Sequence, residues 1–135
     1  MGATARRRRV VLVVDDDPAF REVMSVALAL PELADLGPVR VLTAPDAAVA
    51  LAAMAGRVPD LVLLDVLLED ADGLELCRRL RADPRLQAVP VVAMSGLGAR
   101  ADTEARARAA GCDDYLAKPF PLTELVAATR RWLRA

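Results

Sequence analysis

Five short apolar segments recur along the 135-residue chain, and each is followed by a longer amphipathic segment. Short apolar runs that lie between turn residues are typical of strands. The predicted strands are Val10–Val14, Val39–Leu42, Leu61–Leu64, Val89–Met94 and Tyr115–Ala117. The first, third and fourth are apolar at successive positions, which predicts central strands of a parallel sheet that helices cover on both faces.

The intervening segments carry apolar residues at the spacing of one helix face. Pro31 ends the first of them, and Gly56, Asp83-Pro84 and Gly111 end the next three. We expect helices at about Phe20–Leu28, Asp46–Ala55, Leu74–Leu80, Arg100–Ala110 and Leu122–Leu133. Five strand–helix units predict the α/β class, with a five-stranded doubly wound parallel sheet and right-handed crossovers.

Composition limits the classes of function. The chain has no histidine, which excludes a histidine phosphocarrier and a Ser-His-Asp triad and removes the commonest zinc ligand. A net charge of −1 indicates neither a nucleic-acid partner nor a membrane surface. No apolar run approaches the ~20 residues of a membrane span. Cys77 and Cys112 match no metal or redox spacing, so we expect reduced core residues in a cytoplasmic protein.

The length fits one domain. We expect residues 1–9, which include Arg6 to Arg9, to form a basic N-terminal tail that is not a signal peptide. Residues 10–135 are then the domain itself.

Acidic residues follow two of the predicted central strands. Asp15 and Asp16 come directly after the first strand, and Asp65 comes directly after the third. Asp17 has a structural explanation, because it is a good helix N-cap with Pro18 at the first helical position. The carboxyl ends of parallel strands meet at one edge of the sheet, where ligands bind in such folds. Three carboxylates at that edge predict a site for Mg2+.

Two further polar residues follow the last two strands. Ser95 ends the fourth strand and Lys118 follows the fifth. Each residue alone is compatible with a turn or a surface position. Together with the three acids they provide a carboxylate nucleophile, a metal site, a hydroxyl and an ammonium group, which are the groups that phosphoryl transfer uses.

The whole set resembles the response regulator receiver family of two-component signalling, from Val10 to Leu133. The resemblance is carried by the motifs at residues 13–18 (VVDDDP), 60–65 (DLVLLD), 72–76 (DGLEL), 92–96 (VAMSG) and 110–120 (AGCDDYLAKPF). It implies a flavodoxin-like (βα)5 fold with strand order 2-1-3-4-5. It also implies that the domain is not an enzyme, beyond at most catalysing its own phosphorylation and dephosphorylation.

The resemblance also assigns roles to residues. Asp65 would be the phosphoacceptor, Asp15 and Asp16 the acidic pocket, and Ser95 and Tyr115 the switch pair. Asp16 would be the more direct Mg2+ ligand. Lys118 would pair with the phosphate, and its peptide bond to Pro119 would be cis. The backbone carbonyl of Leu67 would be a Mg2+ ligand beside Asp15, Asp16 and Asp65.

The chain departs from the family pattern in the loop after Asp65. Leu68-Glu69 replaces the usual Met-Pro pair, and Glu69 with Asp70 adds negative charge beside the acceptor. Leu67 and Leu97 are both apolar at positions that often tune the phosphate lifetime. We hypothesise that their side chains shield the acyl phosphate and slow its hydrolysis.

The resemblance implies a sensor histidine kinase or a histidine phosphotransfer protein as phosphodonor. Phosphorylation would change the surface formed by the fourth helix, fifth strand and fifth helix. That surface would contact an output domain, a protein partner or a second copy of the chain. Direct contact with nucleic acid or with a membrane is not expected.

Two other functions compete with this one. Asp15-x-Asp17 after an apolar strand also occurs in haloacid-dehalogenase-like phosphatases, although Ala19 and the short chain disfavour that class. A receiver-like interaction module that does not use phosphate is the second, although the intact set of Asp65, Ser95 and Lys118 argues against it.

Overall fold

The computed structural model describes residues 8–68, 72–96 and 102–133. Within these residues, five parallel strands form one sheet in the order β2-β1-β3-β4-β5. The predicted sheet and its strand order are therefore confirmed. The strands are β1 (Arg9–Val14), β2 (Val39–Ala44), β3 (Leu61–Asp65), β4 (Val91–Ser95) and β5 (Asp114–Ala117).

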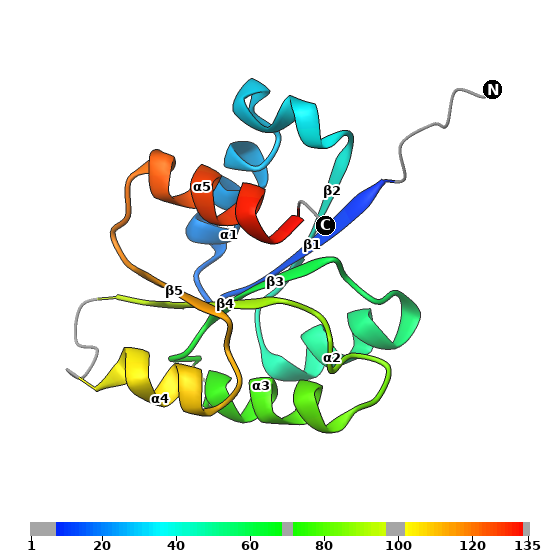
Figure 1. Cartoon of the computed structure of the whole chain (residues 1–135), viewed down its shortest axis with the longest axis vertical. Coiled ribbons are helices and arrows are strands. Elements are labelled where there is room, and N and C mark those ends of the chain that lie inside the picture. The colour runs from blue at the N-terminus through cyan, green and yellow to red at the C-terminus, as the bar shows by residue number, and fades with distance from the viewer. Residues whose placement is uncertain (1–7, 69–71, 97–101, 134–135) are drawn as a thin grey trace.

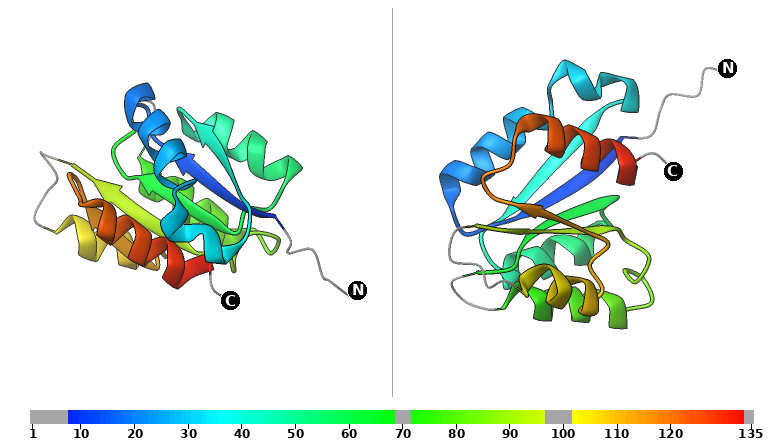
Figure 2. Two further views of the ribbon diagram at one scale, coloured as in Figure 1. Left: turned by 90° about the horizontal axis from the view of Figure 1, so that it is seen from above. Right: turned by 60° about the vertical axis from the view of Figure 1, so that its left-hand side comes forward.

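Helices cover both faces of the sheet (Figure 1). One layer holds α1 (Pro18–Ala27) and α5 (Leu122–Leu133), together with a 3-10 helix, η1 (Pro31–Leu36). The opposite layer holds α2 (Ala47–Gly56), α3 (Gly73–Ala82) and α4 (Thr103–Ala109), as the right-hand view of Figure 2 shows. None of the helices that the structure describes combines the length and the apolar character needed to cross a bilayer.

The central strands are buried on both faces, as their continuous apolar sequence predicts. Alternate residues of a strand point to opposite faces, so β1 contributes to two separate cores. Leu12 and Val14 pack toward the α2, α3 and α4 layer, whereas Val11 and Val13 pack toward α1 and α5. Burial of each large apolar side chain stabilises the fold by roughly 1.5–3 kcal/mol, which fixes the sheet between its two helical layers.

Aspartate side chains cap the N-termini of three helices. Asp17, Asp46 and Asp72 each accept a hydrogen bond from a backbone N–H in the first turn of α1, α2 and α3. Pro18 occupies the start of α1, as predicted. Two of these caps lie directly beside strand ends, so they also fix the path of the chain where it leaves the sheet.

The observed elements differ from the predicted ones at several boundaries, among them those of β4 and α4, and include the additional helix η1. Strand β4 begins at Val91 rather than Val89, and Pro90 between them has no N–H to donate to a neighbouring strand. The 3-10 helix η1 was not predicted, because its apolar residues show no helical period. Helix α4 begins at Thr103, and residues 100 and 101 of the predicted helix lie outside the described residues.

Candidate functional site

All the candidate side chains follow strands that run in the same direction, so they meet at one edge of the sheet. Asp15 and Asp16 follow β1, Asp65 ends β3, Ser95 ends β4 and Lys118 follows β5. The register holds these ends level, since Asp65 is paired with Met94 and Ser95 with Ala117. The site is thus a consequence of sheet topology, because four strands deliver one or two polar residues each.

The three acids gather closely enough to share one cation. Asp15 is fully buried, Asp65 is 8% exposed and Asp16 is half-buried. One carboxylate oxygen of each lies within 4.8 Å of the others. Three carboxylates with partial access to water match the hard oxygen donors that Mg2+ prefers, so the residues present fit this ion.

Backbone N–H groups orient two of these carboxylates. Oδ1 of Asp15 accepts a hydrogen bond from the N–H of Asp17 at 2.9 Å. Oδ1 of Asp65 accepts one from the N–H of Leu67 at 2.8 Å. In both residues the loop after the strand holds one oxygen, and the second oxygen, Oδ2, faces the ammonium group of Lys118.

Lys118 joins the acids from the opposite side of the pocket. Its Nζ lies 2.5 Å from Oδ2 of Asp15 and 3.2 Å from Oδ2 of Asp65. The ammonium group also lies 3.9 Å from the centre of the Phe20 ring, a distance at which the ring face attracts a cation. The Lys118-Pro119 peptide bond is cis, as the family resemblance implied.

Burial and charge act against each other in the pocket. Burial raises the pKa of the Asp65 carboxyl, and the nearby charge of Asp15 adds to that effect. The Leu67 N–H and Lys118 oppose it, but the pKa of Asp65 remains above its usual value. Burial works to lower the pKa of Lys118, yet the hydrogen bond to Asp15 and the charge of Asp65 outweigh burial and raise it.

The two predicted switch residues contact each other directly. Ser95 is buried, and its hydroxyl shares a hydrogen bond with the hydroxyl of the half-buried Tyr115. The family resemblance named the two residues as the switch pair, but it did not predict this bond. Tyr115 therefore already lies against the end of β4 in this structure.

Gly73 shapes the site without contributing a functional group. A Cβ atom added at Gly73 would lie 2.2 Å from the carbonyl oxygen of Asp65 and 2.8 Å from Cα of Val66. The N–H of Gly73 also donates to the carbonyl of Val66 at 3.0 Å. The Asp72-Gly73 motif thus lets α3 begin directly against the backbone of Asp65.

Two residues at the site had no sequence signal for a functional role. Phe20 was predicted as a core position of the first helix, but its ring also borders the Lys118 ammonium group. Arg21 donates from its guanidinium group to the backbone carbonyl of Asp15 at 2.7 Å. Glu69, Asp70 and Leu97 lie outside the described residues.

Sequence comparison relates the chain to one family. A sequence model of the response regulator receiver domain matches residues 11–130. The DNA-binding response regulator MtrA of Mycolicibacterium smegmatis is 40% identical over 131 residues, which cover 94% of this chain and 51% of MtrA. The DNA-binding dual master transcriptional regulator RpaA of Synechocystis sp. is 36% identical over 124 residues, covering 92% of this chain and 48% of RpaA. The chain therefore spans about half the length of these relatives.

Solved structures show the same fold. A putative response regulator from Chloroflexus aurantiacus superposes with a TM-score of 0.83 at 31% identity, covering 96% of this chain and 100% of the other. The receiver domain of the sensor histidine kinase PA1611 from Pseudomonas aeruginosa superposes with a TM-score of 0.79 at 30% identity, covering 96% of this chain and 100% of the other. That structure contains a magnesium ion coordinated in its active-site cleft.

Proposed function

The chain belongs to the family of response regulator receiver domains, and we propose that Asp65 is its phosphoacceptor. Members of this family are signalling modules of two-component systems rather than enzymes, and their general function is phosphorylation on an aspartate. Asp15 and Asp65 both face Lys118 in the acidic cluster, and one observation favours Asp65: its side chain is 11% exposed whereas that of Asp15 is 1% exposed, so a donor can reach Asp65.

The geometry supports a direct phosphoryl transfer to Oδ2 of Asp65. The Leu67 N–H holds Oδ1, so Oδ2 is the oxygen that forms the bond to phosphorus while the bond to the donor's leaving group breaks. Lys118 already touches Oδ2 and would pair with a phosphoryl oxygen. The phosphodonor is a sensor histidine kinase or a histidine phosphotransfer protein, which supplies the histidine that this chain lacks.

Receiver domains bind Mg2+ in the active site, and in this chain Asp15, Asp16 and Asp65 would hold the ion together with the backbone carbonyl of Leu67. An ion held by these residues would supply positive charge beside the phosphoryl oxygens. Asp16 is the more accessible acid, since Asp15 is fully buried and already bonds Lys118. Asp16 would therefore be the more direct ligand, and Asp15 would mainly set the charge of the pocket.

Ser95 and Tyr115 would carry the signal away from the pocket. A phosphoryl group on Asp65 offers new acceptors to the Ser95 hydroxyl, which competes with the bond that this hydroxyl shares with Tyr115. Any change in that pair alters the packing between β4 and β5. This is a population shift between two arrangements, and couplings of this kind are typically ~1–3 kcal/mol.

The surface formed by α4, β5 and α5 is the proposed output face. Ala105 and Ala109 are exposed on α4, so these two small residues are available to a partner. Trp132 is half-buried and donates from Nε1 to Oδ2 of Asp114 at 2.9 Å, so it lies at the edge of the core and connects α5 to β5. An output domain, a protein partner or a second copy of the chain would read this face.

The phosphodonor would approach over the exposed side of α1. Val23 is 61% exposed and Val26 is 63% exposed, which is unusual for large apolar residues on a helix that lies beside a polar site. An apolar pocket beside α1 is lined by residues that include Val23, Lys118 and Leu122. The lysine thus borders both the pocket and the phosphorylation site, so a protein seated there would stand next to Asp65.

The remaining assignments concern the chain as a whole. MtrA and RpaA are DNA-binding proteins by name, and each is about twice as long as the matched region. For this chain we infer output through protein contacts in the cytoplasm, without direct contact to nucleic acid or membrane, since the net charge is −1. We infer that the receiver domain begins at Arg9, because Arg9 already belongs to β1 and pairs with Val39, so the predicted boundary between a basic tail at residues 1–9 and a domain at residues 10–135 moves by one residue.

Phosphorylation with acetyl phosphate and Mg2+ tests the role of Asp65. We expect the wild type to gain one phosphoryl group in intact-mass measurements, and Asp65→Asn to gain none. Asp46→Asn is the matched control, because Asp46 caps α2 away from the pocket and Asn caps helices equally well. Labelling that persists in Asp65→Asn but disappears in Asp15→Asn would instead support the phosphatase alternative.

A further inference from the structure

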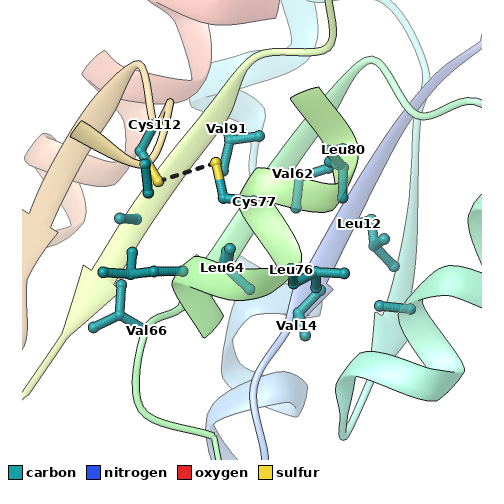
Figure 3. Packing of buried hydrophobic residues seen from close by; sticks show 14 of the residues in the cluster. Leu12, Val14, Val62, Leu64, Val66, Leu76, Cys77, Leu80, Val91 and Cys112 are labelled. Atoms are coloured by element: carbon teal, nitrogen blue, oxygen red, sulfur yellow. Dashed lines mark hydrogen bonds between the residues drawn. The ribbon is translucent and has the colours of Figure 1, made fainter. Parts of the chain in front are cut away.

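The two cysteines are 35 positions apart in sequence but adjacent in space (Figure 3). Cys77 lies in the middle of α3, and Cys112 follows the turn that ends α4. The two Sγ atoms are 3.5 Å apart. Both residues belong to the apolar core between the sheet and the α2, α3 and α4 layer, where Cys77 is fully buried and Cys112 is 6% exposed.

A network of hydrogen bonds around Arg81 holds the two backbones together. Arg81, one helical turn after Cys77, donates from Nε to the carbonyl of Gly111 at 2.9 Å and from its guanidinium group to Asp113 at 2.8 Å. The N–H of Cys112 donates to the carbonyl of Ala107 at 3.0 Å. The residues on both sides of Cys112 are therefore fixed to α3, and the distance between the thiols is set by this frame.

The thiols are also chemically unequal. Cys112 donates its S–H to the sulfur of Cys77, and this hydrogen bond lowers the pKa of Cys77, with the Arg81 charge acting in the same direction. The same hydrogen bond raises the pKa of Cys112. Although burial opposes the lowering of the Cys77 pKa, Cys77 loses its proton more readily than Cys112, and the two sulfurs lie 3.5 Å apart.

We propose that Cys77 and Cys112 form an oxidation site at which a peroxide converts two core thiols into an intrachain disulfide. The Cys77 thiolate attacks one oxygen of hydrogen peroxide, the O–O bond breaks, and the released hydroxide takes up the proton that Cys77 had lost. The Cys112 sulfur then attacks the sulfenic acid on Cys77, and the S–O bond breaks with loss of a second water. Two thiols are oxidised, and one peroxide is reduced to two water molecules.

In this proposal, peroxide would reach the pair through the turn at residue 111, because Gly111 is the half-buried neighbour of the buried Cys112. Gly111 is half-buried and adopts a φ of 107°, and a Cβ there would lie 2.8 Å from the Arg81 side chain. Hydrogen peroxide is little larger than water, so a local opening of this turn is sufficient for it to enter. Larger disulfide reagents would need α3 and α4 to separate.

The disulfide would close a covalent loop that contains β4, Ser95 and α4. It would limit how far the turn before β5 can move relative to α3, because its ends are on α3 and on that turn. The site does not depend on Asp65 or on bound Mg2+, so it can be tested in the unphosphorylated protein.

Peroxide treatment of the folded protein, followed by alkylation and intact-mass measurement, tests the site, because the chain has only two cysteines. We expect alkylatable thiols to fall from two per chain to none, the mass to fall by two hydrogen atoms, and dithiothreitol to reverse both changes. Peptide mapping without reductant would give the Cys77–Cys112 cross-linked peptide. The urea midpoint of the oxidised wild type should rise, since a cross-link restricts the unfolded chain.

Cys77→Ala and Cys112→Ala are the matched controls. Each should keep a single cysteine that forms no intrachain cross-link, and their urea midpoints should not rise on peroxide treatment. The proposal is overturned if the folded wild type retains two alkylatable thiols, or if its oxidised form carries sulfinic acid or links between chains instead. Because these outcomes are read from the wild type, they hold even where an alanine variant folds poorly.

Discussion

Replacing Lys118 by methionine would remove the positive charge between two buried carboxylates while keeping a side chain of similar length. The ammonium group lies 2.5 Å from Asp15 and 3.2 Å from Asp65. The Asp15 side chain is 1% exposed and that of Asp65 is 11% exposed, so water cannot replace the lost partner well. The variant therefore leaves two like charges facing each other in a poorly solvated pocket.

The size of the effect follows from these distances. At an effective dielectric of about 20, the two attractions amount to about 7 and about 5 kcal/mol before any desolvation is counted. Desolvation of the ions cancels most of this, and removing one partner of a buried pair typically costs 3–5 kcal/mol. Since the Lys118 side chain is 19% exposed, we expect a loss of about 3 kcal/mol in the free energy of unfolding at neutral pH.

Urea denaturation in the presence of EDTA measures this loss. Arg78→Met is the matched control, because its ion pair with Glu75 is at least half exposed on both sides and should cost less than about 1 kcal/mol. Added Mg2+ should reduce the difference between Lys118→Met and the wild type, because the ion binds the same acids. The reasoning is refuted if Lys118→Met loses under about 1 kcal/mol in EDTA, or if Mg2+ leaves the difference unchanged.

Three further predictions concern the same pocket. Ser95→Ala and Tyr115→Phe should each lower the free energy of unfolding by about 1 kcal/mol. Because both substitutions remove the same hydrogen bond, a double-mutant cycle measured by urea denaturation should show that the two losses are coupled. Additive losses would mean that the hydroxyls do not interact. Gly73→Ala should destabilise the protein by about 3 kcal/mol or more in thermal unfolding, because its Cβ would overlap the Asp65 carbonyl; a stability equal to that of the wild type would show that α3 begins elsewhere. Because the folded pKa of Lys118 is raised, its stabilisation is fully present below the ordinary lysine pKa and is lost as the pH rises through the folded value. The stability of the wild type relative to Lys118→Met should therefore stay constant up to about pH 10.4 and decline above it, whereas a decline that begins near neutral pH would contradict the raised pKa.

The positions of the site residues could be predicted from sequence because they depend only on the sheet. Apolar runs identify the strands, and parallel strands bring their carboxyl ends to one edge. Asp15, Asp65, Ser95 and Lys118 each follow such a run, so their meeting required no knowledge of side-chain conformation. The cis bond before Pro119 was different, since only the family resemblance indicated it.

The contacts that could not be predicted depend on how helices and side chains pack. The bond between Ser95 and Tyr115 requires a particular orientation of the tyrosine ring, and no pattern in the sequence encodes it. Phe20 follows the helical apolar period, which does not reveal that its ring also borders Lys118. Cys77 and Cys112 become neighbours through the separate placement of α3 and of the turn after α4, so their spacing in sequence gave no indication of a pair.

The proposed function requires that one pocket joins the acids, the hydroxyl and the ammonium group around a phosphoryl site. Lys118 is the only lysine in the chain, so protein labelled with 15N-lysine gives a single side-chain Nζ signal. We predict that beryllofluoride, a mimic of the phosphoryl group, shifts this signal saturably in the presence of Mg2+, and that Asp65→Asn abolishes the shift. A signal that stays unchanged in the wild type while beryllofluoride binds, or that responds equally in Asp65→Asn, would contradict the claim.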